Sequence, residues 1–91
     1  MLKYKVVVHR SVYKFLNGLT EKAIKETIKD HIAKLEDYPL SLREMNTEKI
    51  HGVEKTFRLR VGGYRVKFFV DKSERIIYVT DVKARKKAYK N

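Results

Sequence analysis

The most regular pattern along the chain is an alternation of apolar and cationic residues on both sides of a Gly-Gly pair, in the segment FRLRVGGYRVKF at residues 57–68. A period of two residues is typical of β-strands with one buried and one exposed face, and a two-residue loop at Gly62-Gly63 predicts a hairpin of defined register. In that register apolar residues face apolar residues and cations face cations: Val61 and Tyr64, Arg60 and Arg65, Leu59 and Val66, Arg58 and Lys67, Phe57 and Phe68. We therefore expect one sheet face to carry a row of cations.

Two earlier segments have the period of a helix. The first has apolar residues at i, i+3, i+4 and i+7, and it predicts a helix over residues 10–17 that is stopped by Gly18. The second has a longer stripe, and we expect it to begin after Thr20 as N-cap and to end at Tyr38-Pro39. The two stripes consist of Val12, Phe15, Leu16 and Leu19, and of Ile24, Ile28, Ile32 and Leu35.

Further strands are predicted at residues 4–8 and 75–82, whereas residues 40–54 show no clear period and are interpreted as a connector with a short turn around residues 42–45. The order β-α-α-β-β-β predicts an α+β fold, in which two antiparallel helices pack on one face of a mostly antiparallel four-stranded sheet. A chain of 91 residues suffices for one modest core, so we expect a single domain at residues 1–91 with a basic tail at residues 83–91.

The charge of the chain is unevenly distributed. The formal net charge is +11, and residues 55–91 contain twelve Lys or Arg against three acids, whereas residues 1–54 contain ten against eight. Such a chain attracts polyanions, above all nucleic acid, with an anionic membrane or an acidic protein as lesser options. Like charges opposed across the hairpin cost about 0.2–1 kcal/mol per pair, and a bound phosphate backbone would offset this cost because the arginine fork grips phosphate at two points. The alternative is a solvated face without a ligand.

Composition excludes several other classes of protein. The chain has no Cys, which rules out disulfides and thiolate zinc sites. No acidic cluster or His pair has the spacing of metal ligands, and no Gly-rich loop opens a helix as a nucleotide cradle would, so we expect neither a metal nor a cofactor. The initial segment MLKYKVVV is too short and too charged for a signal peptide, and no segment approaches the length of a membrane span. We expect a cytoplasmic protein without a membrane partner.

Three features together carry a resemblance to a known family. They are the order of elements over the whole chain, the segment FRLRVGGYRV at residues 57–66 and the ending KARKKAY at residues 83–89. In these features the chain resembles the RelE family of toxins from bacterial and archaeal toxin–antitoxin pairs. The related ParE toxins, which attack DNA gyrase, share the fold and parts of the same pattern.

The resemblance implies a ribonuclease that enters the ribosomal A site and cuts messenger RNA there without a metal. The RNA 2′-hydroxyl would attack the neighbouring phosphate and leave a cyclic phosphate and a free 5′-hydroxyl. Matching the family's basic and aromatic positions implies a catalytic set, and we expect an RNA-binding set among the other cations of the hairpin and the tail, of which Lys83 is a weaker match to the family. The catalytic set is Arg58, Arg60, Arg65, Arg85 and Tyr89, and the RNA-binding set is Lys67, Lys83, Lys86 and Lys87.

The proton-transfer residues are left open by the resemblance. Several relatives carry a lysine where this chain has Arg60, and arginine effectively cannot lose its proton. Lys67, Lys83 and His51 are candidates for the general base. Tyr89 would either stack on a splayed base, lend a proton or anchor the tail against the sheet.

The resemblance also implies partners. We expect an acidic, RelB-like antitoxin that forms a heterotetramer with the toxin, contact with the ribosome and messenger RNA, and contact with operator DNA only through the antitoxin. Two other functions stay open, namely a ParE-like inhibitor of DNA gyrase and a non-catalytic basic protein that binds nucleic acid.

Overall fold

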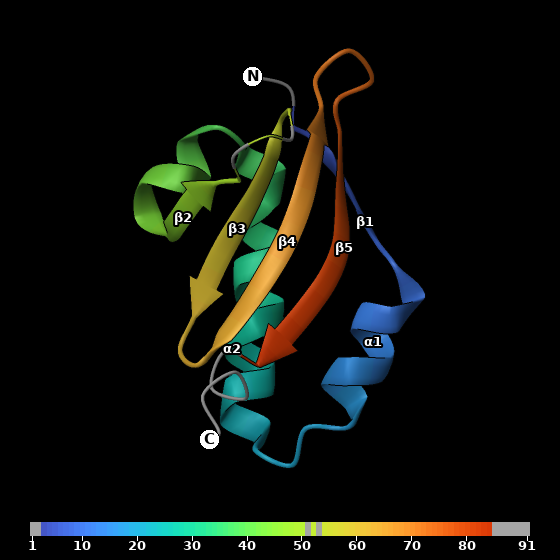
Figure 1. The fold of residues 1–91 in the computed structure, drawn as a ribbon, viewed down its shortest axis with the longest axis vertical. Coiled ribbons are helices and arrows are strands. Elements are labelled where there is room, and N and C mark those ends of the chain that lie inside the picture. Colours follow the sequence, from blue (N-terminus) through green and yellow to red (C-terminus); the bar gives the residue numbers. More distant parts are fainter. Residues whose placement is uncertain (1–2, 51, 53, 85–91) are drawn as a thin grey trace.

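The computed structural model describes residues 3–50, 52 and 54–84. Within these residues it contains five strands, two α-helices and two short 3₁₀ helices, and Figure 1 shows their arrangement. In order, they are β1 (Lys5–Val8), α1 (Arg10–Asn17), α2 (Lys22–Ala33), η1 (Lys34–Asp37), η2 (Leu40–Glu44), β2 (Asn46–Lys49), β3 (Thr56–Val61), β4 (Tyr64–Asp71) and β5 (Ile76–Ala84).

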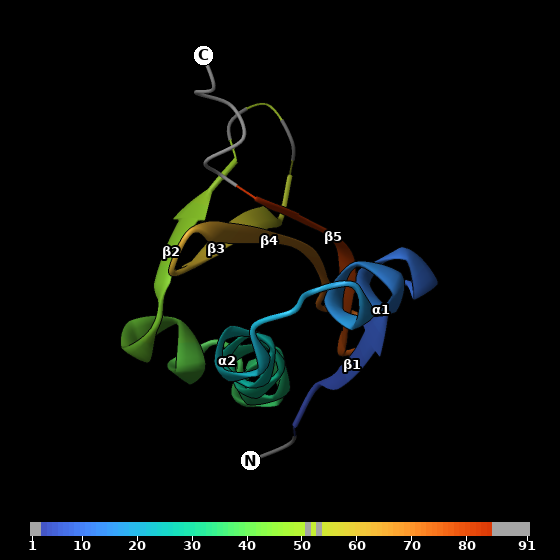
Figure 2. The same cartoon turned by 90° about the horizontal axis from the view of Figure 1, so that it is seen from below.

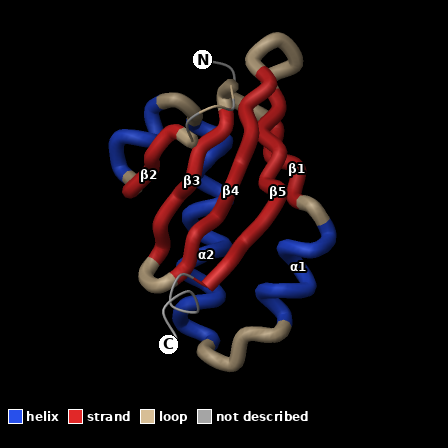
Figure 3. The backbone as a smooth tube through the Cα atoms, viewed as in Figure 1, coloured by secondary structure: helices blue, strands red, loops and turns tan. Residues whose placement is uncertain are grey.

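The strands form a single sheet in the order β1-β5-β4-β3-β2, in which β1 runs parallel to β5 and the other neighbours are antiparallel. Both helices lie on the same side of this curved sheet and run in opposite directions (Figures 1 and 2). No helix of the described residues covers the opposite face, which we call the open face. The predicted α+β class, with two helices on one sheet face, is therefore confirmed. The predicted strand number is wrong, because the segment interpreted as a connector contains the edge strand β2 (Figure 3).

The predicted hairpin has the predicted register. β3 and β4 pair Val61 with Tyr64, Arg60 with Arg65, and so on to Phe57 with Phe68. Gly62 has a φ of 60°, which only glycine adopts readily, so the Gly-Gly pair turns the chain in two residues. The apolar members of the alternation face the helices, and the cations consequently point to the open face.

The first helix begins and ends as predicted, whereas both ends of the second differ. The predicted end at Tyr38-Pro39 is wrong, because α2 ends at Ala33 and the chain continues as the 3₁₀ helix η1 up to Asp37. In α1 the His9 side chain caps the helix by accepting a hydrogen bond from the backbone N–H of Ser11 at 3.0 Å. The N-cap of α2 is Glu21 rather than Thr20, and its side chain makes no capping hydrogen bond. The apolar stripe continues past α2, because Leu35 in η1 is fully buried beside Ile28 and Ile32.

The core lies between the helix layer and the covered sheet face. Its largest fully buried side chains come from every layer, so neither the helices nor the sheet could bury its apolar surface alone: Leu16, Ile28, Leu35, Leu59, Phe68 and Ile77. No helix in the described part of the chain is long and apolar enough to cross a membrane.

Candidate nucleic-acid interface

Two rows of polar side chains cross the open sheet face from strand to strand. The register aligns Asn46 of β2, Arg60 of β3, Arg65 of β4 and Lys83 of β5, which we call the hairpin-end row. Two residues further along β4, it aligns Glu48, Arg58, Lys67 and Asp81, which we call the central row. The residues between these rows on β3 and β4, Leu59 and Val66, are fully buried, so both rows lie on the face away from the helices.

The five cations in these rows, which we call the cationic face, are held on three adjacent antiparallel strands. They are Arg58, Arg60, Arg65, Lys67 and Lys83. Because the strand backbone and the buried alternate residues fix the starting point of each side chain, the cations are placed before any ligand binds. The sequence alone located the first four on one face, and the structure adds Lys83 through the pairing of β5 with β4.

The central row is flanked by acids at both ends. Glu48 Oε2 lies 2.7 Å from Arg58 Nη1 and 3.6 Å from Arg60 Nη2, and Asp81 Oδ2 lies 3.9 Å from Lys67 Nζ. All of these side chains are partly exposed, so each pair stabilises the fold by only about 0–1 kcal/mol. Their larger effect is to reduce the positive field of the central row.

The hairpin-end row is more strongly cationic. Among the described residues, Arg65 and Lys83 have no carboxylate within 4.0 Å. The Nε atoms of Arg60 and Arg65 are buried and donate to no acceptor in the described part of the protein. A buried donor without a partner is unfavourable, and an anion over this row would supply acceptors.

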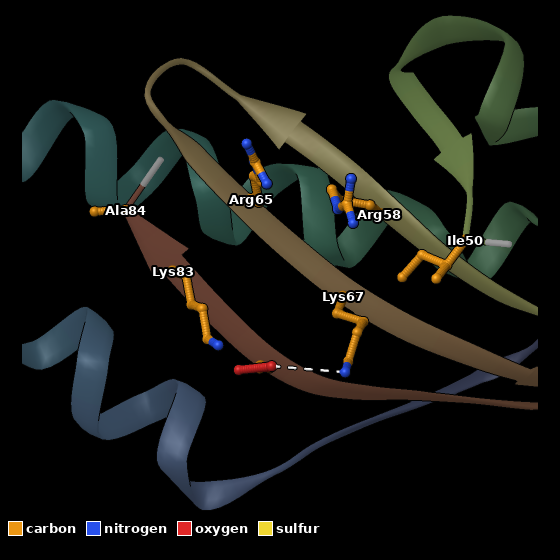
Figure 4. Close-up of a pocket in the computed structure, with 7 residues that line it drawn as sticks. Ile50, Arg58, Arg65, Lys67, Lys83 and Ala84 are labelled. Carbon is orange, nitrogen blue, oxygen red and sulfur yellow. Dashed lines mark ion pairs between the residues drawn. The ribbon is translucent and has the colours of Figure 1, made fainter. Parts of the chain in front are cut away.

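A groove with a volume of about 370 Å³ lies over the cationic face. It is lined by Ile50, Arg58, Arg65, Lys67, Asp81, Lys83 and Ala84. In Figure 4 the side chains of Arg58, Arg65, Lys67 and Lys83 rise from the same side of three neighbouring strands, with the ion pair of Lys67 at one edge. The volume is in the range of small-molecule sites, and the lining favours a ligand with several negative charges.

The remaining predicted residues lie outside the described part of the chain. These are Arg85, Lys86, Lys87 and Tyr89 of the basic tail and His51. In residues 3–50, 52 and 54–84 no three side chains of the types His, Cys, Asp and Glu come together as metal ligands would.

Sequence reasoning missed Glu48 and Asp81 as components of this site. Asp81 and Lys83 lie on either side of the apolar Val82 at the end of the last strand, so they share one sheet face. The face of Asp81 could therefore have been derived once that strand was paired with the hairpin. Glu48 gave no such signal, because it belongs to the strand Asn46–Lys49, which has no apolar residue.

The whole chain matches known toxins. A family model described as "ParE toxin of type II toxin-antitoxin system, parDE" matches residues 6–89. A protein of Methanocaldococcus jannaschii described as "Putative toxin RelE1" is 30% identical over 90 residues, which are 99% of each chain. The chain belongs to the RelE/ParE family of toxins from type II toxin–antitoxin systems.

Solved structures of RelE toxins have the same fold. The RelE–RelB complex of Pyrococcus horikoshii OT3 contains a chain with a TM-score of 0.78 and 28% identity, which covers 90% of this toxin and 94% of that chain. The RelB–RelE complex of Methanococcus jannaschii gives a TM-score of 0.73 at 24% identity and covers 91% and 94%. The toxin is RelE-like over essentially the full length of its fold.

Proposed function

We propose that this RelE-like toxin is an endoribonuclease that cuts messenger RNA in the ribosomal A site and thereby inhibits translation. The RNA 2′-hydroxyl attacks the adjacent phosphate, without a metal, and leaves a cyclic phosphate and a free 5′-hydroxyl. The observation that carries the proposal is the convergence of cations from β3, β4 and β5 on one groove, with Arg65 and Lys83 free of carboxylates within the described residues.

Preorganised cations suit this chemistry because attack by the 2′-oxygen increases the negative charge on the phosphate. A donor aimed at developing charge typically contributes about 2.7–4 kcal/mol to transition-state stabilisation. Arg65 is the principal candidate for this role, since it lines the groove and lies in the hairpin-end row. Arg58 and Arg60 add charge from β3, whereas Arg85 and Tyr89 are assigned by resemblance to the family's C-terminal motif.

The other polar residues bind the RNA or move protons. Lys67 and Lys83 line the groove and would hold flanking phosphates, as would Lys86 and Lys87 of the basic tail. The general base is one of Lys67, Lys83 and His51.

The partner that we propose is an acidic, RelB-like antitoxin. The similar structures from P. horikoshii and M. jannaschii are complexes of RelE with RelB. A chain with a net charge of +11 is complementary to an acidic segment that covers the cationic face. We propose a heterotetramer of the two proteins that contacts operator DNA only through the antitoxin.

The test is primer extension on messenger RNA from translating ribosomes treated with purified toxin. We expect A-site cleavage by the wild type and a loss of about 10²–10³-fold in rate for Arg65→Ala, the size typical of one lost oxyanion donor. The double variant Arg65→Ala with Arg85→Ala should be weaker still. Lys72→Ala is the matched control, because it removes one charge from the exposed turn after β4 and should cleave at the wild-type rate. Full cleavage by the double variant would remove these arginines from the mechanism.

A second candidate function is inhibition of DNA gyrase, the activity implied by resemblance to ParE toxins, and the matching family model is described as a ParE toxin. A supercoiling assay separates the two candidates. Inhibition of supercoiling by a toxin that leaves messenger RNA intact on ribosomes would support the gyrase function.

A further inference from the structure

Beside the two polar rows, the open sheet face carries a third row that is apolar and aromatic. The register aligns Val7 of β1 with Tyr78 of β5, and Tyr78 with Phe69 of β4. Val70, Ile77 and Val79, which flank Phe69 and Tyr78, are buried in the core, and Val6 and Val8, which flank Val7, pack against it. The three side chains of this row therefore point to the open face. Val7 is 37% exposed and Phe69 38% exposed. The rings of Phe69 and Tyr78 are stacked, with centroids 6.3 Å apart and planes inclined by 28°. We call these three residues the aromatic shelf.

The aromatic shelf continues the cationic face along the same strand. On β4, Arg65, Lys67 and Phe69 occupy alternate positions, so they succeed one another on the open face at intervals of about 7 Å. Lys67 belongs to the groove and Phe69 is the next open-face residue of its strand. Two cations followed by a flat apolar surface match a nucleotide strand, in which charged phosphates lie beside flat bases.

We propose that the aromatic shelf is a base-binding subsite, on which a base of single-stranded RNA stacks against Phe69 while the neighbouring phosphates lie on Lys67 and Arg65. The inference rests on the proposed function and names a further contact surface for the same substrate. Stacking on an aromatic side chain accepts any base, because every base presents a π face. The subsite therefore contributes affinity and register along the RNA rather than choice of sequence.

A protein segment is the other conceivable occupant of an exposed apolar surface, but the size of the shelf argues against it. A stable protein–protein interface buries about 1,200–2,000 Å² in total. The shelf consists of three side chains, two of them little more than one-third exposed, which is enough to receive one base. Its continuity with the cationic face also favours a ligand that carries phosphate.

The test measures RNA binding without cleavage. The probe is a fluorescein-labelled, eight-nucleotide 2′-O-methyl oligoadenylate, which lacks the attacking hydroxyl, and the readout is fluorescence anisotropy at several salt concentrations. We expect Phe69→Leu to raise the Kd about tenfold, within the range for loss of one stacked base. The dependence of log K on log salt should be unchanged, since no charge is altered. Phe69→Tyr keeps the ring and should restore the wild-type Kd. Tyr13→Leu is the matched control, because Tyr13 is a 52% exposed aromatic residue on α1, and it should bind as the wild type does.

A second probe separates failure of the shelf from failure of the proposed function. An abasic oligonucleotide of equal length keeps the phosphates, so wild type and Phe69→Leu should bind it equally, whereas Arg65→Ala should bind both probes more weakly and with a smaller salt dependence. If Phe69→Leu bound the adenylate as tightly as wild type while Arg65→Ala did not, the shelf would be wrong and the cationic face would stand. If Arg65→Ala bound like wild type, the proposed function would fail and the shelf with it. Weakened binding of an antitoxin by Phe69→Leu, with RNA binding intact, would make the shelf a protein contact and overturn the inference.

Discussion

Glu48 is the acidic residue of the open face that contacts two arginines at once. Its Oε2 atom lies 2.7 Å from Arg58 and 3.6 Å from Arg60, and the pairing of β2 with β3 places it directly across from Arg58. A carboxylate in this position competes with a phosphate for the same guanidinium groups. The effective charge of the site therefore depends on β2 as well as on the hairpin.

Neutralising this carboxylate should strengthen RNA binding. We expect Glu48→Gln to lower the Kd for single-stranded RNA about fivefold, which corresponds to about 1 kcal/mol for one charge a few ångströms from the ligand in a well-solvated site. Anisotropy titrations at low and moderate salt check this, and the gain should shrink as salt is added because screening weakens the repulsion that the substitution removes.

The control is Glu26→Gln, which removes one negative charge from an exposed position of α2 and should change the Kd little. Unchanged or weaker binding by Glu48→Gln would contradict the role of Glu48 as a competing anion. Tighter binding combined with loss of ribosomal cleavage would give the carboxylate a part in proton transfer.

The cationic residues of the hairpin could be predicted from the sequence, because the alternation gives the sheet face of each residue and the two-residue turn gives the strand register. Arg58, Arg60, Arg65 and Lys67 alternate with apolar residues that must be buried, so the open face was the only place for them. Their acidic neighbours lie outside the hairpin and could not be predicted in the same way. Glu48 comes from β2, which has no apolar residue, and Asp81 comes from β5, whose pairing with β4 has to be known first. A local pattern gives the face of a residue, but not which distant strand lies beside it.

At the scale of elements, the structure departs from the sequence prediction where the polar pattern is weak. The strand β2 consists of Asn46, Thr47, Glu48 and Lys49, so it has no alternation to mark it, and only its hydrogen bonds to β3 make it a strand. The parallel pairing of β1 with β5 also leaves no signal in the local sequence, because the two strands lie about 70 residues apart. The packing of α1 against β5 brings them together. The N-cap of α2 is Glu21 rather than Thr20, which is a shift of one residue at a helix end, where boundaries are least determined.

The hairpin turn is the element on which the register of the cationic face depends. Gly62 has a φ of 60°, and a Cβ atom added there would lie 3.3 Å from Ile24 Cδ1 of α2. We expect Gly62→Ala to lower the free energy of unfolding by about 1–3 kcal/mol, the cost of a residue with a side chain in a sparsely populated backbone region. Urea denaturation followed by circular dichroism measures this change.

Gly63→Ala is the matched control in the same turn. Gly63 has no positive φ of this kind, and a Cβ atom there would meet nothing within 4 Å. This variant should be as stable as the wild type or slightly more stable, because alanine restricts the unfolded chain. Equal losses for the two variants would show that the turn does not impose the backbone strain inferred for Gly62.

At the scale of the whole molecule, the excess of positive charge belongs to the sheet layer rather than to the helix layer. Residues 1–54, which contain both helices, carry ten basic residues against eight acidic ones, whereas the excess of positive charge belongs to residues 55–91. The described part of this second segment forms the three central strands, which cover the helices (Figure 2). The cations of these strands alternate with buried residues and so lie on the face away from the helices. An anionic ligand is therefore attracted toward the open face over distances of about a Debye length, near 10 Å at 0.1 M salt.

Tyr38, which follows η1, connects this helical segment to the sheet through contacts between aromatic rings. Its ring packs edge-on against the rings of Tyr4 and of Phe57 of β3, with distances between ring centroids of 5.2 Å and 6.3 Å. Phe57 in turn stacks on Phe68 of β4. Burial raises the pKa of the Tyr38 phenol above its ordinary value near 10, and the nearby phenolate of Tyr4 raises the pKa further. The folded state thus favours the neutral phenol more strongly than the unfolded state does.

This pKa shift predicts how stability changes in alkali. Below pH 10 Tyr38 is neutral in both states and its packing stabilises the fold fully; above pH 10 the unfolded state ionises first, so stability is lost as the pH rises through the raised pKa of the folded state. We expect the free energy of unfolding of Tyr38→Phe to decline less between pH 9 and 11 than that of the wild type, as measured by urea denaturation at each pH. The control is Tyr13→Phe, which removes an exposed phenol on α1, and its free energy of unfolding should decline as that of the wild type does. This control accounts for the other groups that titrate in this range, among them Lys3, whose pKa is raised by its hydrogen bond to Glu36. An equal decline for Tyr38→Phe and the wild type would mean that ionisation of this phenol is not linked to unfolding, and that the aromatic contacts of Tyr38 persist when it is charged.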